Sequence, residues 1–158
     1  LVAGFYILVE RPFHIGDEIS TATYTGNVED VQIRATKLRI LSGEQVTIPN
    51  SMVFGGTVVN NSFYGERRAT ITITLPQEEY AREETPKIIL KTLQEIETVM
   101  VKPEPTIHIS GYTGPSVTLT LRFWIASKEL ATVSEVMYTL HTVLPSADLA
   151  VVESAGNI

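Results

Sequence analysis

The pattern of apolar residues changes near residue 65, and this change constrains the fold more than any other feature of the sequence. Before that point, short β-type runs alternate with turn residues, and none has helical spacing. Several short strands at this spacing, with no helix between Asp17 and Gly56, are typical of a small curled sheet or barrel. The runs cover residues 17–23, 26–33, 35–41, 45–48 and 56–60.

After residue 66 the sequence predicts the element order β-α-β-β-α-β, which is the split βαβ or ferredoxin-like plan. Strands are predicted over residues 69–75, 106–112, 117–125 and 148–152, because apolar and polar residues alternate there. The boundary between the two parts is expected between Ser62 and Arg67.

Two helices are predicted within the second part, each with one apolar stripe. Thr85-Pro86 predicts the start of the first helix, and Pro103 predicts its end. The start of the second helix stays open between Ser127 and Thr132. The stripes are Ile89, Leu93, Ile96 and Met100 in the first helix, and Leu130, Val133, Met137, Leu140 and Leu144 in the second. In the strand 106–112, Ile107 and Ile109 are expected to face inward.

Composition argues against several kinds of chemistry. The chain has no cysteine, which excludes disulfides, thiolate catalysis and cysteine-ligated metals. Its formal net charge of −6 disfavours binding to nucleic acid. His14, His108 and His141 have no partner at metal-ligand spacing, and no phosphate-binding or nucleophile motif occurs. We therefore expect neither an enzyme nor a bound cofactor or metal.

The first nine residues, Leu1–Val9, are all apolar or glycine. Nine residues are too few to cross a bilayer, which takes about 20 in a helix. Neither a basic region nor a cleavage site marks them as a signal peptide. Two interpretations stay open on these residues alone: a buried first strand, or the end of a membrane helix whose upstream part is missing.

Pro49 and Asn50 are expected to form a sharp turn that fixes where the chain leaves the first part. Proline presets φ and lacks a donor, while asparagine tolerates the left-handed region and can bond its own backbone. We expect this turn to be structural and not a ligand site.

Two segments carry a recognisable pattern, and Asn60-Asn61-Ser62 follows them. The first reads RPFHIGDEI over residues 11–19, and the second runs from Gly26 to Ser51 and closes on Ile-Pro-Asn-Ser. In this order they resemble the small-conductance mechanosensitive channel (MscS) family. The resemblance departs from the family pattern at Val31 to Ile33 and in the last fifteen residues. The matching positions, expected to be structural, are Arg11, Pro12, Phe13, Gly16, Asp17, Gly26, Arg34, Thr36, Arg39, Ile48, Pro49, Asn50, Ser51 and Asn60.

This resemblance implies an α+β chain in three parts. Residues 1–10 would be the remnant of the pore-lining membrane helix. Residues 11–62 would form a small Sm-like all-β barrel, and residues 67–153 a ferredoxin-like βαββαβ domain. The parent would be a homo-heptameric channel in the cell membrane that releases ions and small osmolytes under tension. This portion would lie in the cytoplasm, contact identical subunits, reach the membrane through helices absent from this sequence, and need no cofactor.

The alternative function is a nucleic-acid-binding module that joins an Sm-like domain to an RNA-recognition-like domain. Such domains stack bases on aromatic side chains of the open sheet face. The expected outward residues Arg122 and Trp124 offer a poor stacking platform. We also expect the isolated chain to be monomeric or loosely associated, because copies that each carry −6 repel one another unless salt screens them.

Overall fold

The computed structural model describes residues 2–3, 9–10 and 12–152. The chain divides into two compact units, Leu1–Gly65 (unit 1) and Glu66–Ile158 (unit 2). Among the described residues, no helix has both the length and the apolar character needed to cross a membrane. The chain is an α+β protein in which two antiparallel sheets hold most of the regular structure.

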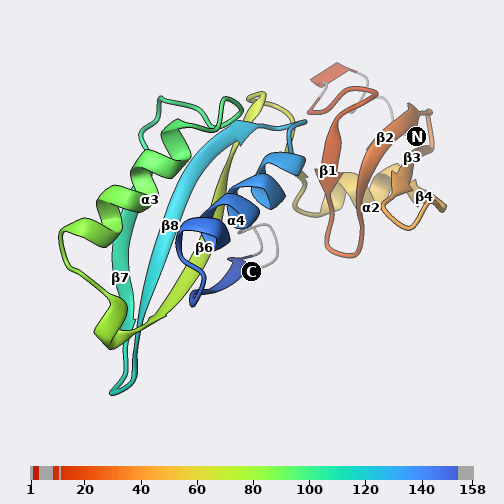
Figure 1. Cartoon of the computed structure of the whole chain (residues 1–158). Coiled ribbons are helices and arrows are strands. Elements are labelled where there is room, and N and C mark those ends of the chain that lie inside the picture. Colours follow the sequence, from red (N-terminus) through yellow and green to blue (C-terminus); the bar gives the residue numbers. More distant parts are fainter. Residues whose placement is uncertain (1, 4–8, 11, 153–158) are drawn as a thin grey trace. The chain divides into compact units, whose positions relative to one another are not determined.

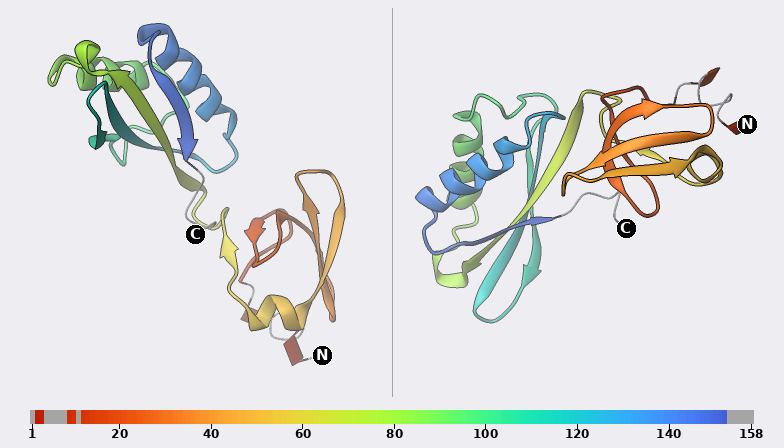
Figure 2. Two further views of the ribbon diagram at one scale, coloured as in Figure 1. Left: turned by 90° about the horizontal axis from the view of Figure 1, so that it is seen from below. Right: turned by 90° about the vertical axis from the view of Figure 1, so that its right-hand side faces the viewer.

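Unit 1 is built on a five-stranded antiparallel sheet with the strand order β4-β3-β2-β1-β5. Its strands curl around a small core (Figure 2), formed by Phe13, Ile19, Val28, Leu38, Ile48 and Val53. The alternation of buried and exposed residues in the strands places Val28 and Leu38 on the face that meets this core. The elements are β1 (Glu18–Ser20), β2 (Thr25–Val31), β3 (Ala35–Ile40), β4 (Gln45–Pro49), α2 (Asn50–Gly55) and β5 (Val59–Asn60).

The helix α2 contradicts the prediction that no helix lies between Asp17 and Gly56. Pro49 is extended, with φ −56° and ψ 132°, so it ends β4 and leads directly into the helix. Val53 is buried in the core of unit 1 and holds the helix against the sheet. Asparagine and serine are common both in turns and at helix starts. The Pro-Asn-Ser run therefore predicts a turn equally well, but in the structure it begins the helix α2.

Unit 2 is a four-stranded antiparallel sheet with the strand order β7-β8-β6-β9 and two helices (Figure 1). The inward residues of β6 and β8 share one core with the inward residues of both helices, so both helices cover the same face of the sheet. The elements are β6 (Glu66–Pro76), a 3-10 turn η1 (Gln77–Glu79), α3 (Glu84–Gln94), β7 (Thr106–Tyr112), β8 (Ser116–Ala126), α4 (Ala131–Val143) and β9 (Asp148–Val152).

Three details of unit 2 differ from the sequence predictions. The first helix ends at Gln94 and not near Met100, although Ile96 and Val99 remain in the core. Ile109 is 44% exposed because β7 is an edge strand whose pairing with β8 becomes irregular after this residue. Leu130 precedes α4 and is 48% exposed, whereas Val136, which the predicted stripe does not include, is fully buried.

Candidate functional site

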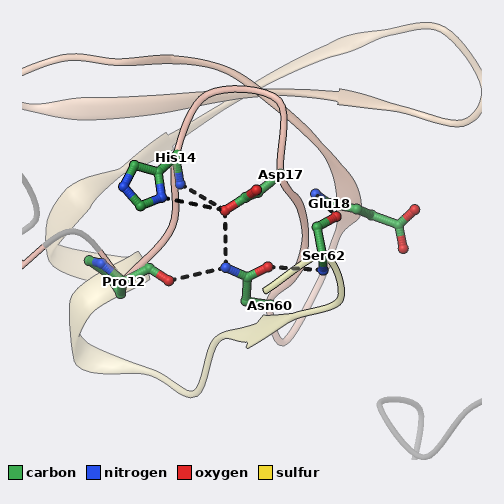
Figure 3. A network of polar contacts seen from close by, with 6 residues as sticks. All are labelled: Pro12, His14, Asp17, Glu18, Asn60 and Ser62. Atoms are coloured by element: carbon green, nitrogen blue, oxygen red, sulfur yellow. Dashed lines mark hydrogen bonds and ion pairs between the residues drawn. The ribbon is translucent and has the colours of Figure 1, made fainter. Parts of the chain in front are cut away.

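A network of polar contacts joins the segment that leads into unit 1 to the segment that leaves it (Figure 3). We call residues 12–17 the lead-in segment. The Asn60 side-chain amide donates to the Pro12 carbonyl (3.2 Å) and to Asp17 Oδ2 (3.1 Å). The same carboxylate oxygen accepts the backbone N–H of His14 at 2.9 Å. The network thus brings Asn60 to Pro12, 48 residues away in sequence, and to Asp17, 43 residues away.

The exit side of this network is fixed by its own backbone contacts. Asn60 Oδ1 accepts the Ser62 N–H at 3.0 Å, and Ser62 Oγ accepts the Glu18 N–H at 3.0 Å. The Asn61 side-chain amide donates to Glu18 Oε1 at 2.9 Å and to Ser20 Oγ at 3.2 Å. Glu18 begins β1, so the run Asn60-Asn61-Ser62 is bound to the first strand at three successive residues. In the sequence, the one signal for the bond between Ser62 and Glu18 is the run of three polar residues, Asn60-Asn61-Ser62.

The lead-in segment is also anchored by its turn and by the core. Phe13 is buried in the core of unit 1. Gly16 has φ +96°, a left-handed value that favours glycine, and its N–H donates to the Val28 carbonyl at 2.8 Å. His14 Nδ1 lies 3.9 Å from Asp17 Oδ2, with the His14 side chain exposed. The segment therefore has one defined path onto the sheet.

A second polar cluster lies at the start of α2, around Asn50, which is 1% exposed. Its Oδ1 accepts the hydroxyl of Thr36, itself fully buried, at 2.8 Å. Its Nδ2 donates to the carbonyls of Gln32 (2.7 Å) and Ile33 (3.2 Å). The Asn50 backbone N–H reaches the Arg34 carbonyl at 2.9 Å. Asn50 is thus helical and binds the β2–β3 connection, where we had expected a left-handed residue bonded to its own backbone.

Another matching position, Gly26, lies where two strands approach closely. A Cβ added at Gly26 would lie 2.5 Å from the Arg39 carbonyl oxygen, so the pairing of β2 with β3 leaves no room for a side chain there. The remaining matching positions are dispersed. Ile48 is in the core, while Arg34, Arg39 and Ser51 are exposed, and Arg11 lies outside the described residues.

The first cluster holds one imidazole beside one carboxylate, His14 and Asp17, and the side chains that bond one another in the cluster around Asn50 are an amide and a hydroxyl. Within residues 2–3, 9–10 and 12–152, no three His, Cys, Asp or Glu side chains gather to hold a metal. His108 and His141 are exposed. A groove of about 210 Å³ in unit 1 is lined by threonines and apolar residues such as Tyr24, Met52 and Val53. A hydrogen bond from Lys102 lowers the pKa of Glu104, but both groups lie on the surface. The hydrogen bonds of the two clusters position the backbone of unit 1.

Comparisons with known proteins point in one direction. The family described as "Mechanosensitive ion channel, beta-domain" matches residues 1–62. An uncharacterised MscS family protein of Archaeoglobus fulgidus is 30% identical over 145 residues, which cover 91% of this chain and 51% of that protein. The small-conductance mechanosensitive channel MscMJ of Methanocaldococcus jannaschii is 28% identical over 130 residues, covering 78% of this chain and 35% of that channel.

The fold agrees with these relatives. The crystal structure of Helicobacter pylori MscS in its closed state matches with a TM-score of 0.84 at 21% identity, over 97% of this chain and 61% of that one. This chain spans about half the length of the archaeal MscS family protein and smaller shares of the other relatives. Since the match to the β-domain, the relatives and the fold all agree, the chain belongs to the MscS family of mechanosensitive channels.

Proposed function

We propose that this chain forms part of the cytoplasmic vestibule of a mechanosensitive channel subunit. Tension in the membrane would open the pore of the full-length protein and release ions and small osmolytes. Relatives that carry the names of mechanosensitive channels support the proposal. The proposal assigns no covalent chemistry and no cofactor to this part of the protein, and it takes identical subunits, seven in the full channel, as its partners.

We propose further that unit 1 is an Sm-like barrel and unit 2 a ferredoxin-like domain. The meander β4-β3-β2-β1-β5 curled around one small core supports the first assignment. Support for the second comes from the order β7-β8-β6-β9, with both helices on one face. The domain limits proposed are residues 11–62 and 67–153.

The observation that carries the proposal is the hydrogen-bonded path of the lead-in segment. Residues 1–10 precede it, and we propose that they continue a pore-lining membrane helix of the full-length protein. Asn60 binds both Pro12 and Asp17, so the direction in which the chain arrives at the sheet is set by several contacts. A part of the channel that must follow its pore helix needs such a defined junction.

Expression of the full-length gene in cells that lack their own mechanosensitive channels tests this function. Cells that carry it should survive a sudden drop in osmolarity, and membrane patches should show channel openings that depend on applied suction. Asn60→Ala should shift the suction needed for opening, whereas the same change at the exposed Ser51 should leave it unaltered. A protein that reaches the membrane but never opens under suction would refute the proposal.

A further inference from the structure

The sheet of unit 2 has a second face, opposite its helices, that the channel function leaves unexplained. The even-numbered residues of β6 and β8 lie on this face, because the odd-numbered ones fill the core. Threonines dominate it, and we call it the hydroxyl face. Away from the strand ends, its members on the adjacent strands β6, β8 and β7 are Arg68, Thr70, Thr72 and Thr74 of β6, Thr118, Thr120, Arg122 and Trp124 of β8, and Thr106 and His108 of β7.

Arg122 occupies the centre of the hydroxyl face and has an unsatisfied donor. Its Nε is buried, and no hydrogen-bond partner for it exists among the described residues. A buried N–H without an acceptor is costly, and buried polar groups in proteins are nearly always paired. An arginine held in this way is therefore suited to an acceptor that comes from outside the chain.

The neighbours of Arg122 on this face are threonines, which are uncharged and whose hydroxyl groups can donate as well as accept hydrogen bonds. Thr70 and Thr106 lie directly across from it on the two adjacent strands, and Thr120 lies two residues before it. Cross-strand side chains on one face stand about 5 Å apart, which is within reach of one small ligand. In the described part of the chain, no hydrogen bond occupies the hydroxyl of Thr70, Thr106 or Thr120, whereas the hydroxyls of Thr74 and Thr118 bond each other.

The charged side chains near the centre of the hydroxyl face are the two arginines, Arg122 and Arg68. Arg68 lies across from Trp124, one step diagonally from Arg122. The described strand residues on this face include two carboxylates, Glu66 and Asp148. Glu66 begins β6, and Asp148 of β9 pairs with Thr74 near the other end of β6. From strand spacing and rise, each lies about 14–16 Å along and across the sheet from Arg122. Among the described strand residues, the centre of this face therefore holds two guanidinium groups and no carboxylate, in a chain whose net charge is −6.

We propose that the hydroxyl face binds a small oxyanion of the phosphate, sulfate or carboxylate class at Arg122. The guanidinium supplies charge and paired N–H donors, which match an oxyanion well, and the free threonine hydroxyls supply further donors. Arg68 adds charge at the rim. This inference does not depend on the channel function, and it would hold for the isolated chain.

Trp124 is the only tryptophan of the chain and follows Arg122 by two residues on the same face, so its fluorescence reports directly on the site. We would titrate the 158-residue chain with sodium phosphate, sulfate and glutamate in separate arms, exchanging each against sodium chloride at fixed ionic strength. Phosphate or sulfate should give a saturable change in Trp124 emission. The glutamate arm decides whether a carboxylate serves as well as a tetrahedral anion.

Matched variants separate the site from general charge effects. Arg122→Gln should weaken anion binding about tenfold or more, the expected loss for charge-assisted hydrogen bonds. Arg82→Gln, the same change at an exposed residue outside the strands of this face, should alter it by less than about twofold, as expected for a surface charge. Arg122→Lys, which keeps the charge but loses the paired donors, should fall between them.

The result that overturns the proposal is equally specific. A change in emission that chloride reproduces, or that Arg122→Gln retains, excludes the site. If Arg122→Gln fails to fold, the proposal can be tested on the unaltered chain by the NMR signal of the Arg122 Nε–H, which Arg122→Lys assigns. If phosphate does not shift this signal, binding at Arg122 is refuted. Binding of single-stranded RNA without any response to free anions would also refute it, in favour of a nucleic-acid surface.

Discussion

The substitution Asn50→Leu gives the most direct test of the physical argument for unit 1. Leucine has nearly the shape of asparagine but can neither accept the Thr36 hydroxyl nor donate to the carbonyls of Gln32 and Ile33. Thr36 is fully buried, so water cannot replace the lost acceptor without opening the structure. The two carbonyls lie in the exposed β2–β3 connection and can be hydrated at smaller cost.

The magnitude follows from these three contacts. A buried hydroxyl left without a partner costs about 1–3 kcal/mol, and each lost bond to a hydrated carbonyl costs about 0.5–1 kcal/mol. Together they predict a loss of about 3 kcal/mol in the free energy of unfolding of unit 1. For a unit of this size, that loss corresponds to a fall in Tm of about 12–24 °C.

Amide hydrogen exchange is the suitable assay, because it resolves unit 1 from unit 2 residue by residue. Amides of β3, such as that of Leu38, should exchange about 100-fold faster in Asn50→Leu, which is the factor that about 3 kcal/mol predicts. Ser51→Ala, one residue along and exposed, is the matched control and should leave these rates unchanged. Thr36→Val combined with Asn50→Leu should cost about 1 kcal/mol less than the sum of the single changes, since both remove one shared bond.

A loss below about 1 kcal/mol in Asn50→Leu, the ordinary size of a net hydrogen bond, would refute this reasoning. It would mean that the cluster around Asn50 is hydrated or rearranges freely. Strict additivity of the double variant would likewise show that Thr36 and Asn50 do not act together. A stable variant that had lost the binding of some ligand would contradict the structural role altogether.

Four further results are expected. Gly26→Ala should destabilise unit 1 by about 2 kcal/mol or more in thermal unfolding, because its Cβ would meet backbone at 2.5 Å, while Gly55→Ala, with open space around it, should be neutral or stabilise by up to about 1 kcal/mol. Asn60→Ala removes two hydrogen bonds to the lead-in segment and should cost about 1–2 kcal/mol in the same assay; an unchanged Tm would show that these two bonds do not stabilise unit 1. Lys102→Met should return the lowered pKa of Glu104 towards its ordinary value in a carboxyl NMR titration. The contact with Lys102 stabilises the charged form of Glu104; it is fully present above the ordinary pKa of a glutamate and is lost as the pH falls through the lowered pKa. A pKa that stays low in Lys102→Met would point to another cause. Light scattering of the isolated chain at two salt concentrations should find monomers or loose association that strengthens with salt, and a salt-independent heptamer would refute the charge argument.

Strict alternation made the strands of unit 2 predictable from sequence. In β8, the residues Val117, Leu119, Leu121, Phe123 and Ile125 are all buried, as their spacing predicts. The limits of β7 and β9 agree with the predicted ones, 106–112 and 148–152. These elements depend mainly on which face meets the core, and a two-residue period reports that choice directly.

Periodicity failed where the chain stays in the core but changes its backbone conformation. Ile96 and Val99 continue the apolar stripe of α3 beyond its end at Gln94, because the turns after the helix still pass under the sheet. Spacing records burial and not dihedral angles, so it could not locate that end. The cluster around Asn50 was hidden for another reason: its partners lie 14 to 18 residues away and include backbone carbonyls, which no side-chain pattern reveals.

The contacts between the lead-in segment and Asn60 have a mechanical consequence. Pulling on the chain at Pro12 loads the hydrogen bonds to Asn60 first, so tension crosses from one end of unit 1 to the other without traversing its five strands. β1 shares the load next, since it pairs with β5 directly behind these contacts. If these few hydrogen bonds and the pairing of β1 with β5 hold, the other strands and the core of unit 1 would carry little of the load, and the force that breaks these bonds would set the point at which the unit begins to open.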